Sequence, residues 1–237
     1  ETGKQSTATM AAEVAVTALA WSPDGRRIAS AGNDKNVIFW DPVTSKSLRT
    51  HVFTPNVNYA LAWNKSGSQL AIGGAGGHIA IIEKSSGGSK ISAFTGHSSF
   101  VRGVSWSPDG RYLVSSGDDG SVKYWDALTH GPIGMPEKIE DGPLSTVSWG
   151  PDGMHVLSND IKGRVRVSLS PSAWIEKICS TLTRNFSPEE WDYYVDKNVD
   201  YTVQCPGLPV PKRGQYPVDE VNLRQSKMFK QGLEIWD

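Results

Sequence analysis

One short motif returns four times at an almost constant spacing, and this regularity constrains the fold more than any other feature of the chain. Trp21-Ser-Pro-Asp-Gly25 recurs as Trp63-Asn-Lys-Ser-Gly67, Trp106-Ser-Pro-Asp-Gly110 and Trp149-Gly-Pro-Asp-Gly153, at intervals of 42, 43 and 43 residues. Trp-Asp pairs follow at residues 40–41 and 125–126. A period of about 40 to 45 residues with these features is typical of a four-stranded propeller blade. The sequence therefore predicts an all-β fold with about four blades' worth of repeats.

Each repeat divides into three apolar runs separated by turn residues. In the third repeat the runs are 101–106, 112–116 and 122–125, with turns at Pro108-Asp-Gly110 and Asp118-Asp-Gly120. Apolar runs bounded in this way indicate half-buried antiparallel strands, here called strands a, b and c. Shifting the pattern by one period predicts the same strands within 16–40, 58–82 and 144–168. Strand c of the second and fourth repeats departs most from the pattern.

These residues resemble the WD40 family, and the resemblance covers roughly Glu1 to Ser168, so we expect a repeat domain over 1–169. In that family a hydrogen-bonded tetrad of Asp, His, Ser and Trp stiffens a blade. Alignment implies a complete tetrad only in the third repeat, formed by His97, Ser115, Asp119 and Trp125. The first repeat keeps Ser30, Asp34 and Trp40 but has Ala12 at the histidine position, and the fourth has Glu140, Ser158, Lys162 and Ser168.

The resemblance also points to a rim where partners bind. In WD40 relatives the loops before strand a and between strands b and c often contact other proteins, and loops on a rigid scaffold commonly carry recognition. By register the candidate residues are Asn33, Tyr59, Phe100, Arg102 and Asp118. Aromatic residues and arginine are enriched at interface hot spots. The alternative is that Tyr59 and Phe100 only pack between adjacent blades.

The two ends of the chain indicate an incomplete ring. Residues 1–4 resemble the segment that follows a Trp-Asp pair in this family, and residues 231–237 end on their own Trp-Asp. An open arc would leave unpaired strand edges. We therefore expect an arc whose missing blades come from another stretch of polypeptide or another chain. A compact four-blade ring and a dimer of arcs are the alternatives.

After the repeats the period is lost. The apolar residues from Trp174 to Leu182 fall on one face of a helix, and Ser187-Pro188 is a helix start, so 170–212 is predicted to be a helical, Pro-rich strap packed on the propeller. Residues 213–237 are predicted to be a linker with a possible further blade strand.

The tail, including Cys205-Pro-Gly-Leu-Pro209, resembles that of bacterial WD40 proteins of the STAND NTPase type. No Gly-x4-Gly-Lys-Ser/Thr motif occurs in this chain, so any nucleotide chemistry would belong elsewhere.

Charge and cysteine content exclude several classes of function. Lys and Arg number 24 against 25 Asp and Glu, so no basic field favours nucleic acid, and no apolar run suits a membrane span or a signal peptide. With only Cys179 and Cys205, we expect no disulfide framework, a reducing compartment and a cytoplasmic location. The glycosylation sequons at Asn64 and Asn185 are interpreted as chance.

No catalytic constellation stands out. Asp118 and Asp119 near His97 are explained by the repeat, Cys179 falls on an apolar helical face where it would be buried and inert, and the glycine run 73–77 opens no helix. We therefore predict no enzyme activity, no cofactor and no metal site. The predicted function is a non-catalytic recognition or sensor module of a larger, bacterial signalling protein, which binds protein partners. The alternative is a purely structural arc that completes a propeller ring with another chain.

Overall fold

The computed structural model describes residues 15–52, 57–85, 88–139, 142–185, 187–188, 205 and 207–212. It divides the chain into two compact units, residues 1–168 and 169–237. Among the described residues no helix has the length and apolar character needed to cross a membrane.

The first unit contains four antiparallel sheets, one per repeat. Their strands are listed in chain order: blade 1, β1 (Val16–Trp21), β2 (Ile28–Gly32), β3 (Asn36–Trp40) and β4 (Ser47–Val52); blade 2, β5 (Asn58–Trp63), β6 (Gln69–Gly74), β7 (His78–Ser85) and β8 (Gly88–Thr95); blade 3, β9 (Val101–Trp106), β10 (Tyr112–Gly117), β11 (Ser121–Asp126) and β12 (Pro132–Lys138); blade 4, β13 (Leu144–Trp149), β14 (His155–Asp160) and β15 (Val165–Leu169). The predicted all-β propeller arrangement is confirmed, including strands β7 and β15, which were the least regular in sequence.

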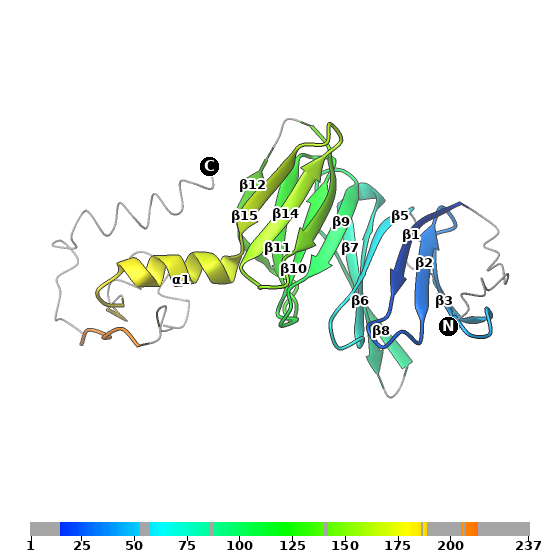
Figure 1. The fold of residues 1–237 in the computed structure, drawn as a ribbon, viewed down its shortest axis with the longest axis horizontal. Coiled ribbons are helices and arrows are strands. Elements are labelled where there is room, and N and C mark those ends of the chain that lie inside the picture. Colours follow the sequence, from blue (N-terminus) through cyan, green and yellow to red (C-terminus); the bar gives the residue numbers. More distant parts are fainter. Residues whose placement is uncertain are drawn as a thin grey trace, which may run out of the picture. The chain divides into compact units, whose positions relative to one another are not determined.

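In blades 2 and 3 the indole of the repeated tryptophan joins the blade to the one before it, whereas in blade 4 the indole of Trp149 donates to Gly153 of its own turn. Strands β1, β5, β9 and β13 pack in succession, so the four sheets lie side by side in chain order (Figure 1). The indole nitrogen of Trp63 donates to the carbonyl of Ala20 at 3.2 Å, and that of Trp106 donates to the carbonyl of Ala62 at 2.9 Å. The period of the sequence is therefore also the period of the contacts between blades.

Glycine allows two kinds of close approach in this frame. The last residue of the repeated turn has a φ of 68° at Gly25 and 73° at Gly110, a backbone region that favours glycine. In the turn between β6 and β7, a three-residue helix, η1 (Ala75–Gly77), ends on Gly77, where a Cβ would overlap the backbone oxygen of His97. Gly77 therefore allows two backbone segments to approach closely. The glycine run opens no long helix, as its sequence indicated.

The four blades do not close on themselves. In blade 1, Leu19 and Trp21 are 67% and 60% exposed, and in blade 4, Val165 and Val167 are 67% and 60% exposed. Side chains of this kind would be covered if the first and last blades packed together. The described residues therefore form an arc, and the compact four-blade ring is not formed.

The second unit begins with helix α1 (Pro171–Thr181), in the region where the sequence predicts it. Ser170 Oγ accepts from the backbone nitrogen of Ala173, which is 3% exposed, whereas Ile175 is 51% exposed. Trp174, Cys179 and Leu182 of the predicted apolar face are half-buried, so only Ile175 differs from the expectation among the described residues of that face. Most of the predicted second helix after Ser187, the linker from 213 and the closing Trp-Asp pair lie outside the described residues.

The expectation of reduced cysteines is wrong, because Cys179 and Cys205 form a disulfide with their Cα atoms 5.4 Å apart. Their separation of 26 residues gives no sign of this in the sequence. Asn185 folds the chain back: its side-chain nitrogen donates to the carbonyls of Cys205 and Leu208, and its Oδ1 accepts from the Cys205 nitrogen at 2.7 Å. The disulfide removes the premise from which a reducing compartment was predicted.

The same contacts bear on the two sequons. Asn185 is 1% exposed, and Asn64 is 6% exposed with its side-chain nitrogen donating to Ser68 and Gln69. Neither amide is accessible for glycosylation in the folded chain.

Candidate functional site

The four tetrad residues of blade 3 form one hydrogen-bonded chain. Trp125 Nε1 donates to Ser115 Oγ at 2.8 Å, Ser115 Oγ lies 2.7 Å from His97 Nε2, and His97 Nδ1 lies 3.0 Å from the carboxylate of Asp119. His97 and Ser115 are 4% and 0% exposed. These distances fit one direction of donation: the indole donates to the hydroxyl, the hydroxyl to the imidazole and the imidazole to the carboxylate. Each of these buried polar groups therefore has a partner.

Asp119 is the charged end of this chain. Burial alone raises the pKa of Asp119, but hydrogen bonds from His97 and Ser121 outweigh burial and hold it well below its usual value. Ser121 Oγ donates to Asp119 Oδ1 at 2.7 Å, and the backbone nitrogen of Ser98 donates to Oδ2 at 3.0 Å. The sequence comparison missed Ser121 and Ser98, although their positions two residues after Asp119 and one after His97 are the available signal.

The tetrad is less complete in blade 1. Trp40 Nε1 donates to Ser30 Oγ at 2.7 Å, which reproduces the indole end of the chain. Asp34 Oδ1 accepts from the backbone nitrogen of Asn36, so it stabilises its own turn. Position 12 lies outside the described residues.

Four of the five predicted rim residues form a cluster, here called the rim cluster: Tyr59, Phe100, Arg102 and Asp118. Arg102 donates to Asp118 through Nε at 2.8 Å and through Nη2 at 2.7 Å. The hydrogen bonds to Asp118 raise the pKa of Arg102, so its positive charge is secure at any physiological pH.

The guanidinium of Arg102 also stacks on both aromatic rings. Its central carbon lies 4.5 Å from the centroid of the Tyr59 ring and 5.2 Å from that of Phe100, and the two rings are 5.5 Å apart. Because Tyr59 belongs to blade 2 and the other residues to blade 3, the cluster crosses a blade interface. Phe100 is 38% exposed and the Arg102 side chain 35%, so the cluster packs between blades and also faces solvent.

Asn33 is not brought into this cluster. It lies in the equivalent turn of blade 1, where it is exposed and its backbone nitrogen donates to the carbonyl of Ala15 at 3.1 Å. Thr17 occupies the blade 1 position that corresponds to Tyr59 and Arg102, and its hydroxyl donates to the carbonyls of Ala31 and Asn58. The interface between blades 1 and 2 therefore has no aromatic rim of this kind.

The described residues contain no group of three or more His, Cys, Asp or Glu side chains placed to hold a metal ion. The rim cluster presents a fixed cation and two partly exposed aromatic rings, groups that can make cation–π and apolar contacts.

Comparison with known families agrees with this geometry. The model of the WD domain, G-beta repeat family matches residues 4–41 and 88–126. These segments are WD40 repeats. The second match ends at Trp125-Asp126 and contains the complete tetrad, Phe100, Arg102 and Asp118.

Similar curated proteins share the repeats over part of their length. The chain is 34% identical over 112 residues to cell division cycle 20.1, cofactor of APC complex, from Arabidopsis thaliana, which covers 47% of this chain and 24% of that protein. It is 33% identical over 108 residues to WD repeat-containing protein SL1-17 of Schistosoma mansoni (46% and 35%), and 31% identical over 132 residues to the ribosome biogenesis protein WDR12 homolog of Oryza sativa subsp. japonica (54% and 28%). The matched region thus spans between 24% and 35% of the length of these relatives.

Proposed function

We propose that the WD40 repeats of this chain act as a protein-interaction module and that the rim cluster is the partner-binding surface. The observation that carries this proposal is the fixed position of Arg102, which the bidentate bond to Asp118 and the two rings hold in one place. A side chain that is already ordered loses little conformational entropy when a partner binds. The partly exposed Phe100 adds apolar area beside this charge.

The experiment is a quantitative binding comparison between the wild type and two variants, Phe100→Ala and Arg102→Ala, against partners captured with the intact chain. Each change is expected to weaken binding by about 2 kcal/mol, roughly a thirtyfold loss of affinity, if these residues are hot spots. Leu128→Ala is the matched control, because Leu128 is 88% exposed in the turn between β11 and β12 of the same blade.

Melting curves separate recognition from packing. An unchanged affinity in both rim variants would place the partner surface elsewhere on the propeller. A large loss of stability with no specific loss of affinity would mean that Tyr59 and Phe100 serve the blade interface alone.

The alternative function is a structural arc completed by another chain, and one observation favours it. Trp21 occupies the position from which Trp63 and Trp106 donate to the preceding blade, yet it is 60% exposed beside the exposed Leu19. Trp21→Glu should then abolish association measured by sedimentation, whereas Val43→Glu, at a 91% exposed position in a loop, should not. A wild-type chain that stays monomeric at all concentrations, alone and with its captured partners, contradicts this alternative.

The non-catalytic character, the role as a sensor in a larger signalling protein and the cytoplasmic location stay predictions. The relatives compared above are eukaryotic proteins, so they lend no support to a bacterial origin or to an attached STAND NTPase.

A further inference from the structure

The disulfide of the second unit joins two cysteines in different surroundings. Cys179 lies in α1 and is half-buried, whereas Cys205 lies 26 residues later along the chain and is 1% exposed. Bringing together two residues at such a separation costs conformational entropy, and the cost rises with the length of the loop. Contacts that hold Cys205 near α1 in the reduced chain would offset this cost before the S–S bond forms.

Asn185 supplies contacts of this kind. Its Oδ1 accepts from the backbone nitrogen of Cys205 at 2.7 Å, and its Nδ2 donates to the carbonyls of Cys205 at 3.0 Å and of Leu208 at 2.9 Å. The backbone nitrogen of Asn185 also donates to the carbonyl of Pro209 at 2.8 Å. Both ends of the side-chain amide and the backbone of one residue therefore hold the segment from Cys205 to Pro209.

These hydrogen bonds lie in the interior of the second unit. Asn185 is 1% exposed, as is Cys205, and a hydrogen bond that is shielded from water is stronger than an exposed one. The backbone nitrogen of Leu208 donates to the carbonyl of Cys205 at 3.2 Å, which closes the segment into a turn. Arg184 Nη1 donates to the carbonyl of Asn185 at 2.9 Å. None of these bonds involves a sulfur atom, so they can form whether or not the disulfide is present.

The place of Asn185 in the sequence makes its contacts effective. It follows Cys179 by six residues and comes shortly after the end of α1 at Thr181. With Cys205 bound to Asn185, the two sulfur atoms are linked through these six residues and a hydrogen bond instead of through a free loop of 26 residues. Groups that are held together in this way react at a high effective concentration.

We propose that Asn185 is a positioning residue for the cysteine pair: it holds Cys205 beside Cys179 in the reduced chain, so that the disulfide persists against a monothiol such as glutathione. This inference concerns the second unit alone and does not depend on the function of the rim cluster.

Reduction by a thiol proceeds in two exchanges. The first reductant thiolate attacks one cysteine sulfur, the S–S bond breaks, and the other cysteine leaves as a thiolate that takes up the proton released by the reductant. A second reductant thiol then displaces the first cysteine, which also takes up a proton, and the two reductant sulfurs form a disulfide. The Asn185 bonds keep the freed cysteine next to the mixed disulfide, so that reclosure competes with the second exchange.

The test is the redox equilibrium of the intact chain in mixtures of reduced and oxidised dithiothreitol, with the state of the cysteines read by alkylation and mass spectrometry. Asn185→Ala removes the three side-chain hydrogen bonds. It should shift the equilibrium toward the dithiol by about tenfold or more, because the net contribution of one or two hydrogen bonds corresponds to this factor. A tenfold shift raises the reduction potential by about 30 mV.

Asn64→Ala is the matched control. Asn64 is also a buried asparagine, 6% exposed, and its side-chain nitrogen donates to Ser68 and Gln69 in blade 2. Its loss removes a comparable set of bonds far from the cysteines in the sequence, so the redox equilibrium should stay unchanged.

A second measurement needs no variant. In the reduced wild type, the amide hydrogens of Asn185 and Cys205 should stay protected from exchange with solvent, as observed by NMR, because their bonds do not require the disulfide. The wild-type pair should also stay oxidised in a buffer that contains predominantly reduced glutathione.

Four results would overturn the proposal: full reduction of the wild type by glutathione, an unchanged reduction potential in Asn185→Ala, rapid exchange of the Cys205 amide after reduction, or an equal shift of the potential in Asn64→Ala. The exchange result decides the matter even if Asn185→Ala does not fold.

Discussion

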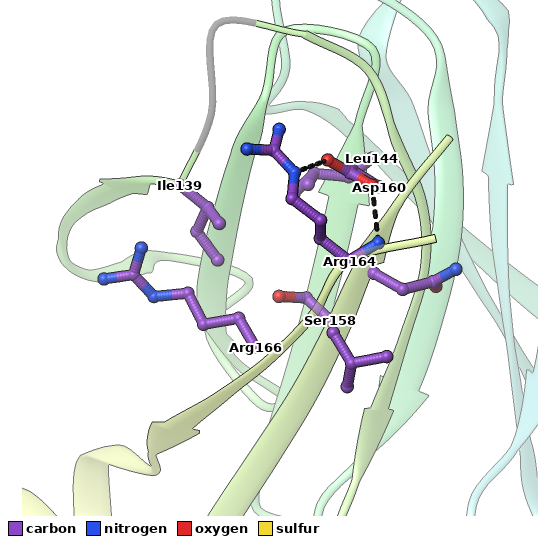
Figure 2. A pocket seen from close by; sticks show the side chains of 8 residues that line it. Ile139, Leu144, Ser158, Asp160, Arg164 and Arg166 are labelled. Atoms are coloured by element: carbon purple, nitrogen blue, oxygen red, sulfur yellow. Dashed lines mark hydrogen bonds and ion pairs between the residues drawn. The ribbon is translucent and has the colours of Figure 1, made fainter. Parts of the chain in front are cut away.

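Blades 3 and 4 each have three inner strands with the same pattern, but different side chains lie beside strands b and c in the two blades. Blade 3 places His97 and Trp125 around the Ser115 hydroxyl and ends the chain of hydrogen bonds on a carboxylate. Blade 4 keeps the serine, as Ser158, and the described residues leave a cavity of about 360 Å³ beside it (Figure 2). Strand pairing and contacts with the neighbouring blade are present in both, so we expect the tetrad to add stability to a sheet that the backbone already defines.

The largest effect should come from removing the indole of blade 3. Trp125 is 4% exposed, and Trp125→Ala should lower the free energy of unfolding by about 3–5 kcal/mol, because it leaves a large void and an unfilled bond at Ser115. Denaturant titration measures the change. Ser168→Ala is the control at the same position of blade 4, where only the bond from Ser168 Oγ to Glu137 is lost, and it should cost about 1 kcal/mol. Equal losses of unfolding free energy in Trp125→Ala and Ser168→Ala would contradict the difference described between blades 3 and 4.

His97→Ala should have an intermediate effect. It removes the partner of Ser115 and of Asp119 in a buried site, and an unpaired buried group costs about 1–3 kcal/mol. The variant should lower the thermal midpoint without changing the rim cluster. His155→Ala, which removes an exposed pair with Asp152 in blade 4, should change the midpoint very little. A midpoint that matches the wild type would show that the bridge contributes nothing.

The smallest effect should appear in the pH dependence. Asp119 has a lowered pKa in the folded chain, so its carboxylate stabilises the fold above its ordinary unfolded pKa, near 4. This contribution is lost as the pH falls through the lowered folded value. Asp119→Asn should therefore be less stable than the wild type at neutral pH, by about 1 kcal/mol, and the difference should shrink between pH 5 and pH 2. A difference that stays constant over this range would mean that the charge of Asp119 is not responsible.

Repetition made most of the fold predictable. The four repeats share a period and three apolar runs, so strands a, b and c of each blade could be placed without any knowledge of long-range contacts, whereas the fourth strands β4, β8 and β12 were not predicted. The tetrad residues were equally accessible, because His97, Ser115, Asp119 and Trp125 occur at fixed positions within one period. Residues whose positions follow from aligning the repeats with one another can therefore be located from the sequence alone.

Features that depend on side-chain partners across different parts of the chain were decided by the tertiary structure. The rim residues were candidates from their positions, but the bond between Arg102 and Asp118 and the stack on Tyr59 arise because two adjacent blades turn these side chains toward one another. Asn33 has the same register and no such neighbours, so register alone cannot select among equivalent positions.

The sequence by itself determined the blades, since a local period of hydrophobic residues and turns fixes strands and their order. The tertiary structure decided the disulfide between Cys179 and Cys205 and the cavity beside Ser158. The disulfide joins residues 26 positions apart, with the Asn185 side chain hydrogen-bonded to the Cys205 backbone, and the cavity is lined by residues between positions 139 and 166 that come from several strands and turns. The pairing of two distant cysteines and the packing of side chains around a cavity both depend on three-dimensional distances. A pattern along the sequence does not contain these distances.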